Sequence, residues 1–218
     1  QRVRALLWFR DNLELIEKNI TVNHPIFIAL KDTSEKFPIR IVDLKLLIEG
    51  MEDDLFPTKY ESFEDVRSYC FKVASTVGLN LIEIYGYSNP DAREYAEEMG
   101  IFLQMVNILR DIKEDRGRGR LYLPTDELKM FDINPDEIGD MNLANTKKWK
   151  NFMKHYINRT KTHRNNALNL IPLIEGDSRR NPQMMCAVYS SILSEAEKRN
   201  GDVLSRRLQL SFMKKVGF

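Results

Sequence analysis

Residues 99–115 read MGIFLQMVNILRDIKED, and this stretch decides the fold and the function expected of the whole chain. A helix turns by about 100° per residue, so residues spaced three or four apart lie on one face. In this stretch polar or small residues recur at that spacing and share one narrow arc of the predicted helix. These residues are Gly100, Gln104, Asn107, Asp111 and Asp115. Apolar side chains surround this stripe on most sides of the helix, as is typical of a largely buried helix. The sequence therefore predicts a buried helix with one polar stripe.

The buried polar groups of this stripe need hydrogen-bond partners or a bound ion. Buried amides and carboxylates cost free energy unless something satisfies them, and Asp111 and Asp115, one turn apart, repel each other. A divalent cation between them would remove both costs, and a purely oxygen donor set favours Mg²⁺ over Zn²⁺. The alternative is a solvated helix end, with Asp115 in water beside Arg116. Gln104 and Asn107, within an apolar stretch, favour the cation site.

Basic residues follow and interleave with these acids. They are Arg110, Lys113, Arg116, Arg118 and Arg120. Protein-bound Mg²⁺ takes one or two carboxylates and completes its shell with phosphate and water, while arginine and lysine bind the remaining phosphate oxygens. The pattern predicts a diphosphate site, and its alternative is an ordinary charged helix end.

A second informative helix is predicted over about 62–86. Tyr69, Val73, Thr76 and Asn80 share one of its faces, and small residues lie beside them. Small side chains let a helix or a ligand approach closely, and one hydroxyl among aliphatic groups suits a long apolar substrate with one reactive end. The alternative for Tyr69 is a core tyrosine whose hydroxyl group is hydrogen-bonded within the protein.

The rest of the chain also predicts helices. Only ten glycines and eight prolines interrupt its 218 residues, and apolar residues recur at helical spacing, for example in a predicted helix over about 145–175. Asn-Pro pairs at 89–90, 134–135 and 181–182 are typical of helix starts. No run alternates as a strand would. We expect one all-α domain over residues 1–218.

Composition excludes several classes of protein. A formal net charge of +1 argues against a general nucleic-acid binder, and no apolar run approaches the roughly 18 residues of a membrane span. Cys70 and Cys186 form neither a disulfide framework nor a zinc knuckle, so a reducing cytoplasm is the expected setting. Residues 198–218 hold six basic side chains and one acid. They predict a solvated basic face or, alternatively, an anion site or peripheral contact with the inner face of the membrane.

Three segments resemble the signatures of the squalene/phytoene synthase family, in matching order and spacing. They are YCFKVASTVG at 69–78, QMVNILRDIKED at 104–115 and RLYLP at 120–124. The resemblance runs from about Trp8 to the C-terminus. Within the family, residues 85–95, 189–193 and 201–204 are most similar to bacterial presqualene diphosphate synthases of hopanoid pathways.

The resemblance implies an isoprenoid-synthase-type helical bundle around a central cavity, in which Mg²⁺ lies between two aspartate-rich motifs. It implies that Asn107, Asp111 and Asp115 are metal ligands, and that Tyr69 and the two aspartates are catalytic. The resemblance, taken with the polar stripe and the basic residues beside it, also implies a set of substrate-binding residues. They are Val73, Gln104, Arg110, Arg120, Tyr122, Tyr189, Arg206 and Lys214.

One departure concerns the family's first aspartate-rich motif, which precedes the helix that opens this chain. Asp11 stands alone, and residues 52–54 (EDD) lie in the wrong place for that motif. The first methionine is Met51. We therefore expect a domain truncated at its N-terminus, with the missing helices and half of the metal site upstream of Gln1, and inactive by itself.

The function expected from the resemblance is Mg²⁺-dependent head-to-head condensation of two farnesyl diphosphates to presqualene diphosphate. Alternatives in the family are synthesis of squalene, which would add NADPH, of dehydrosqualene, or of the carotenoid precursor phytoene from geranylgeranyl diphosphate. An alternative of another class is a non-catalytic relative that acts as an assembly factor. Retention of Asn107, Asp111 and Asp115 argues against it, whereas the absent first motif favours it.

Overall fold

The computed structural model describes residues 1–56 and 58–208, and helices make up nearly all of its regular structure. The α-helices are α1 (Arg2–Glu17), α2 (Pro25–Lys36), α3 (Ile41–Asp53), α4 (Phe63–Cys70), α5 (Thr76–Tyr85), α6 (Ala92–Gly117), α7 (Thr125–Met130), α8 (Lys147–Ala167) and α9 (Arg180–Lys198). The shorter turns are a π-helix η1 (Phe71–Ser75) and 3₁₀ turns η2 (Pro135–Glu137), η3 (Met141–Asn145), η4 (Leu168–Leu173) and η5 (Gly176–Arg179). In the described residues the β-pairing is one isolated bridge, Tyr87–Ile174. The all-α prediction is confirmed.

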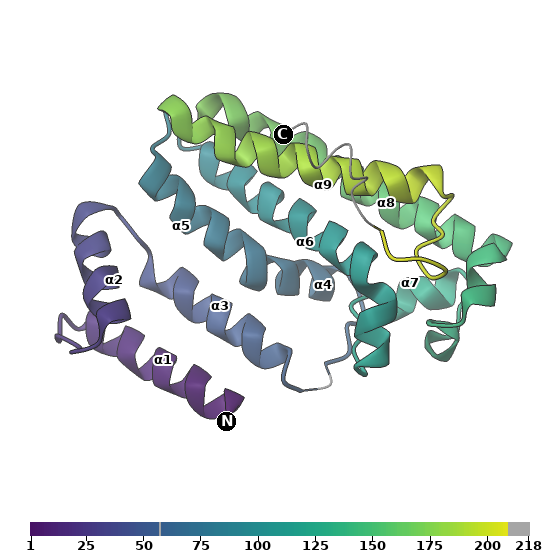
Figure 1. Ribbon diagram of the computed structural model, residues 1–218, viewed down its shortest axis with the longest axis horizontal. Helices are drawn as coiled ribbons and strands as arrows, with labels where there is room; N and C mark the ends of the chain where they lie inside the picture. The colour runs from purple at the N-terminus through teal and green to yellow at the C-terminus, as the bar shows by residue number, and fades with distance from the viewer. Residues whose placement is uncertain (57, 209–218) are drawn as a thin grey trace.

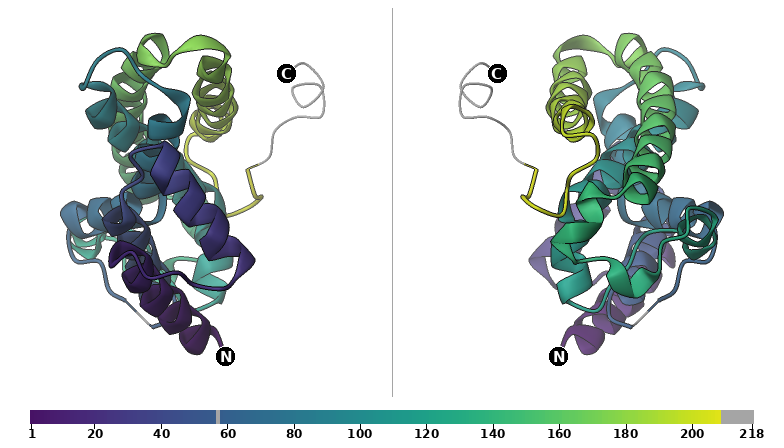
Figure 2. Two further views of the ribbon diagram at one scale, coloured as in Figure 1. Left: turned by 90° about the vertical axis from the view of Figure 1, so that its left-hand side faces the viewer. Right: turned by 90° about the vertical axis from the view of Figure 1, so that its right-hand side faces the viewer.

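Helix α6 lies at the centre of the molecule. It contacts α4, η1 and α5 on one side and α8, η4 and α9 on the other. Figure 1 shows the order of the rows, from α1 through α3 and α5 to α6 and then to α8 and α9, and Figure 2 shows the same bundle end-on. The large core surrounds α6, with Phe102, Met105 and Leu109 fully buried against the α8 side chains Phe152 and Tyr156. A smaller apolar cluster joins α1, α2 and α3.

The predicted helix over 62–86 forms as α4, η1 and α5, without a break between Phe63 and Tyr85. Ser62 caps its start, because its hydroxyl accepts from the Asp65 amide and the Asp65 carboxylate accepts from the Ser62 amide. The π-turn in its middle was not predicted. There the Ser75 hydroxyl donates to the carbonyl of Glu97 at 2.7 Å. This bond fixes η1 against α6.

Three predicted helix boundaries were wrong. The helix expected over 145–175 ends at Ala167 and continues as the 3₁₀ turn η4, because Pro172 has no amide hydrogen and its ring opposes a regular helix. Asn89 and Asn181 do not start their helices, since α6 begins at Ala92 and α9 already at Arg180. The third pair, Asn134-Pro135, starts a helical turn as predicted and forms a capping box, but this turn is only a 3₁₀ turn.

A half-buried carboxylate on α6, Glu98, is hydrogen-bonded to two side chains of α8, and this contact predicts a pH dependence. His163 Nδ1 and Asn166 Nδ2 both lie 2.9 Å from Glu98 Oε2. Burial raises the pKa of Glu98, but these two hydrogen bonds outweigh it, so the pKa of Glu98 lies below its ordinary 4.5. The carboxylate therefore stabilises the fold above pH 4.5, and this contribution is lost as the pH falls through the lowered pKa.

We expect Glu98→Gln to lower the free energy of unfolding at pH 7 and to flatten its decline in acid. Urea denaturation between pH 3 and pH 7, a range of about four units around the carboxylate pKa values, measures both effects. Glu94→Gln is the matched control, because Glu94 is exposed on the same helix. Equal acid dependence in wild type and Glu98→Gln would contradict the prediction.

Candidate active site

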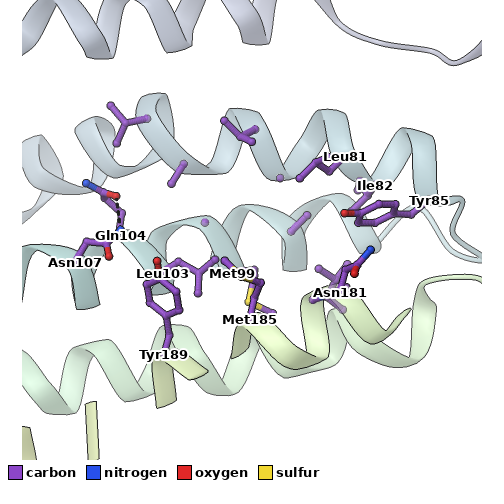
Figure 3. Close-up of a pocket in the computed structure, with 18 residues that line it drawn as sticks. Leu81, Ile82, Tyr85, Met99, Leu103, Gln104, Asn107, Asn181, Met185 and Tyr189 are labelled. Atoms are coloured by element: carbon purple, nitrogen blue, oxygen red, sulfur yellow. Dashed lines mark hydrogen bonds between the residues drawn. The ribbon is translucent and has the colours of Figure 1, made fainter. Parts of the chain in front are cut away.

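A mostly apolar cavity of about 310 Å³ lies between α5, α6 and α9. In Figure 3 Gln104 and Asn107 lie at one end, Tyr85 and Asn181 lie at the other, and Leu103, Met99, Met185 and Tyr189 lie between them. The remaining lining residues are Val73, Ala74, Val77, Gly78, Leu81, Ile82, Ala96, Gly100, Leu170 and Pro182. The predicted polar stripe of α6 therefore begins inside an apolar cavity and leads out of it.

Asn107 has an unsatisfied oxygen at this end of the cavity. Its Nδ2 donates to Gln104 Oε1 at 3.2 Å, the dashed line in Figure 3. Its Oδ1 is buried and has no hydrogen-bond partner in residues 1–56 and 58–208. A buried carbonyl oxygen without a partner costs free energy, so this position suits a ligand that accepts its lone pairs.

Asp111 lies one turn further along α6 and is held between two arginines. Arg110 contacts it through both Nε and Nη2, at 3.0 and 2.5 Å, and Arg207 Nη2 lies 2.6 Å from Oδ1. Burial raises the pKa of Asp111, but the hydrogen bonds from Arg110 and Arg207 outweigh it and hold the pKa below its ordinary value. Asp111 is therefore ionised at neutral pH.

Asp115 behaves in the opposite way. Burial raises its pKa, and the nearby carboxylates Asp111 and Asp54 raise it further, against the opposing effects of Arg118 and Arg120. The negative charges of neighbouring carboxylates at the end of the stripe are therefore not fully compensated by the nearby arginines. A bound cation would reverse this penalty.

Asp54 also lies at this site, although no sequence pattern predicted a role for it there. Asp54 follows α3, and its Oδ1 accepts hydrogen bonds from Tyr122 Oη at 2.6 Å and Tyr69 Oη at 3.0 Å. The two phenol rings stack with centroids 4.8 Å apart, and Arg120 Nη2 donates to the Asp54 carbonyl at 2.7 Å. Asp54 was considered above only as a candidate for the first aspartate-rich motif, and the structure places it beside Tyr69 and Tyr122 at the end of α3.

Both phenols of this cluster stay protonated at neutral pH. Burial raises the pKa of Tyr122 to about 12, helped by its hydrogen bond to Asp54. Burial, and then the charge of Asp54, raises the pKa of Tyr69 well above its ordinary value. Each O–H can therefore donate to the carboxylate.

The remaining predicted residues divide into three groups. Val73, Gln104 and Tyr189 line the cavity, as expected of substrate-binding residues. Arg206 is exposed, and its carbonyl accepts from Arg199, while its neighbour Arg207 reaches Asp111. Lys214 lies outside the described residues.

The donor set of the stripe fits Mg²⁺. Asn107, Asp111 and Asp115 offer only oxygen, the ligand type that Mg²⁺ prefers, and the Asn107 oxygen is free to coordinate. In the part of the chain that the structure describes, no three His, Cys, Asp or Glu side chains converge on a metal position. These residues could therefore hold a cation whose coordination shell is completed by other ligands.

Comparison with known proteins gives the same family along nearly the whole chain. The model of the squalene/phytoene synthase family matches residues 1–214. The 15-cis-phytoene synthase of Synechocystis sp. is 33% identical over 201 residues, which cover 87% of this chain and 59% of that protein. The phytoene synthase of Arthrospira platensis is 32% identical, over 94% of this chain and 71% of its own length. The chain thus spans about three fifths to seven tenths of these relatives.

Solved structures confirm the isoprenoid-synthase-type fold. The squalene synthase HpnC of Alicyclobacillus acidocaldarius superposes with a TM-score of 0.83 at 22% identity, over 92% of this chain and 75% of that one. A dehydrosqualene synthase in complex with a ligand gives 0.85 at 22% identity, over 97% and 74%. None of the helices described here has the length and apolarity needed to cross a bilayer. The chain belongs to the squalene/phytoene synthase family of prenyltransferases.

Proposed function

We propose that the full-length protein condenses two molecules of farnesyl diphosphate head to head and forms presqualene diphosphate. The observation that supports this most directly is the buried, unpartnered oxygen of Asn107 at the end of an apolar cavity. Asp111 and Asp115 continue the same helix face towards the basic residues. A substrate with a long apolar chain and an anionic head matches this arrangement, in which an apolar cavity is followed by carboxylates and then by basic residues.

The cavity would bind the prenyl chain and exclude water from it. Its lining is aliphatic, aromatic or thioether over most of its length, so a carbocation formed there would meet few nucleophiles. Arg110 and Arg120, near the carboxylates, would bind diphosphate oxygens. Because Arg110 and Arg207 neutralise Asp111 in this structure, substrate binding would redistribute these ion pairs.

Asn107, Asp111 and Asp115 would hold Mg²⁺, which when bound acts as a Lewis acid and a template for the leaving diphosphate. In the proposed reaction, the carbon–oxygen bond of the first substrate breaks and its electron pair leaves with diphosphate. The double bond of the second substrate attacks the allylic cation. Loss of one proton then closes the cyclopropane. NADPH would be needed only if the reaction continued to squalene.

A second candidate is phytoene synthesis from two molecules of geranylgeranyl diphosphate. It is favoured by the sequence relatives, which are phytoene synthases at 32–33% identity. Squalene and dehydrosqualene synthases, in turn, are the structural neighbours. The two candidates share the proposed site and differ in the length of prenyl chain that the cavity must accept.

The test is to incubate the full-length protein with farnesyl or geranylgeranyl diphosphate, with and without Mg²⁺ and NADPH, and to identify the products by mass spectrometry. From farnesyl diphosphate we expect presqualene diphosphate. We expect this product only when Mg²⁺ is present, and we expect that its formation does not require NADPH. Phytoene from geranylgeranyl diphosphate would replace this proposal by the second candidate. No condensation of either substrate would contradict both and favour a non-catalytic relative.

A further inference from the structure

The proposed reaction must release a proton, and a hydrogen-bonded pair of a tyrosine and a carboxylate, Tyr69 and Asp54, lies close to the residues that line the cavity. We propose that Asp54 is the final acceptor of the proton lost when the cyclopropane closes, and that Tyr69 passes it on. This inference rests on the proposed function. It concerns a residue outside the α6 stripe.

Tyr69 lies about one helical turn before Val73, and Val73 lines the cavity. Tyr69 itself is buried, and its Oη donates to Asp54 Oδ1 at 3.0 Å. With its hydrogen directed at Asp54, the phenol oxygen has lone pairs left for a proton from the substrate.

The transfer balances with these groups alone. A C–H bond breaks on the carbon that is separated from the cationic carbon by one intervening carbon, and its electron pair forms the new C–C bond that closes the three-membered ring. The released proton bonds to the Tyr69 oxygen, while the original Tyr69 hydrogen moves to Asp54 Oδ1. The phenol ends neutral, the carboxylate becomes a neutral acid, and the positive charge of the substrate is removed. No oxidant, reductant or further base takes part.

Tyr69 alone could not complete this step. Burial and Asp54 keep the phenol protonated, so no phenolate is available as a base. A neutral phenol can accept a proton only if it gives up its own at the same time, and Asp54 is the carboxylate within hydrogen-bond distance.

The surroundings hold Asp54 ready for this role. Tyr122 Oη donates to the same oxygen at 2.6 Å, and stacking fixes the two rings against each other. Arg120 binds the Asp54 backbone carbonyl rather than its carboxylate. The carboxylate is therefore oriented by two phenols without a direct hydrogen bond from that guanidinium.

Asp54→Asn tests the relay, because the amide keeps the size and an acceptor oxygen of the carboxylate but cannot take up the proton. In the full-length protein with farnesyl diphosphate and Mg²⁺, we expect kcat to fall about 10²-fold, the range of general acid–base contributions, with little change in KM. We also expect prenyl alcohols, formed by water capture of the cation, to replace part of the presqualene diphosphate. The kinetic isotope effect at the deuterated C–H should increase.

Asp53→Asn is the matched control. Asp53 is the adjacent acid and pairs with Lys72 at 3.1 Å, so its substitution removes the same charge without touching the phenols and should leave products and kcat near wild type. Asp54→Glu should restore part of the activity, because it keeps a base. If Asp54→Asn unfolds at lower temperature than wild type, Tyr69→Phe interrupts the same path and should give the same shift in products.

Several results would overturn the relay. Unchanged products and isotope effect in Asp54→Asn would leave the released diphosphate as the base. A higher Mg²⁺ requirement with unchanged products would assign Asp54 to the metal site instead. Both results require an active wild-type protein, so they refute the relay without refuting the proposed function. A wild-type protein that condenses neither substrate refutes both.

Discussion

In the full-length protein, we expect Asp111→Ala to lower kcat by on the order of 10³ or more, since a metal ligand contributes several kcal/mol to the transition state. Asp111 is the carboxylate that lies between the Asn107 oxygen and Asp115 on one face of α6. Its removal would take one of three proposed Mg²⁺ ligands. It would also leave Arg110 and Arg207 without their present partner.

The measurement is steady-state turnover of farnesyl diphosphate over a range of Mg²⁺ concentrations. If Asp111 binds the cation, Asp111→Asn should retain more activity than Asp111→Ala and should require more Mg²⁺. Stability should change little, because Asp111 lies at the edge of the core and its partners are arginines that solvent can reach.

Glu114→Ala is the matched control for this prediction. Glu114 also pairs with Arg207, at 3.3 Å, but it is exposed and lies outside the stripe. It should keep near wild-type turnover. Near wild-type, Mg²⁺-dependent turnover in Asp111→Ala would contradict the proposed metal site.

The sequence predicted α6 and its stripe correctly because both depend on local periodicity. Residues 100, 104, 107, 111 and 115 are close along the chain, so helical geometry alone places them on one face. The same reasoning predicted the helix over 62–86, which the structure forms from Phe63 to Tyr85. The helix class of the whole chain followed from the same periodicity.

The tyrosine cluster could not be predicted in this way. Asp54 meets Tyr69 and Tyr122 across sequence separations of 15 and 68 residues, and no local period relates them. Asp54 also lies just after the end of α3, where helical spacing no longer fixes the direction of a side chain. Arg207 reaches Asp111 from a segment without regular structure, so spacing could not distinguish it from Arg206.

The π-helix η1 lies within a correctly predicted helix, but its π geometry could not be predicted from the sequence pattern. Phe71–Ser75 contains residues that fit an ordinary α-helix, and only its packing distinguishes it. Gly50 of α3 approaches it from one side and Gly100 of α6 from the other. Such close approach depends on two partners that are distant in sequence, and π-turns frequently accompany functional sites.

We expect Gly100→Ala to lower the free energy of unfolding by about 2 kcal/mol, since overpacking costs up to about 3 kcal/mol and alanine returns up to about 1 kcal/mol of helix propensity. A Cβ atom at Gly100 would lie 2.4 Å from Ser75 Cα and 2.5 Å from Ser75 N. These are backbone atoms, which cannot rotate away as a side chain can. Helix α6 and η1 would therefore have to separate.

Urea denaturation measures this loss, and Gly117→Ala is its matched control. Gly117 is in the same helix, has a helical backbone and would meet no atom within 4 Å, so alanine there should be neutral or stabilising. Separation of α6 from η1 would also move Gln104 and Asn107 relative to Val73, across the cavity that they line together. Gly100→Ala should therefore lose turnover even at temperatures where it remains folded. Full stability and turnover in this variant would show that the two helices do not need this close contact.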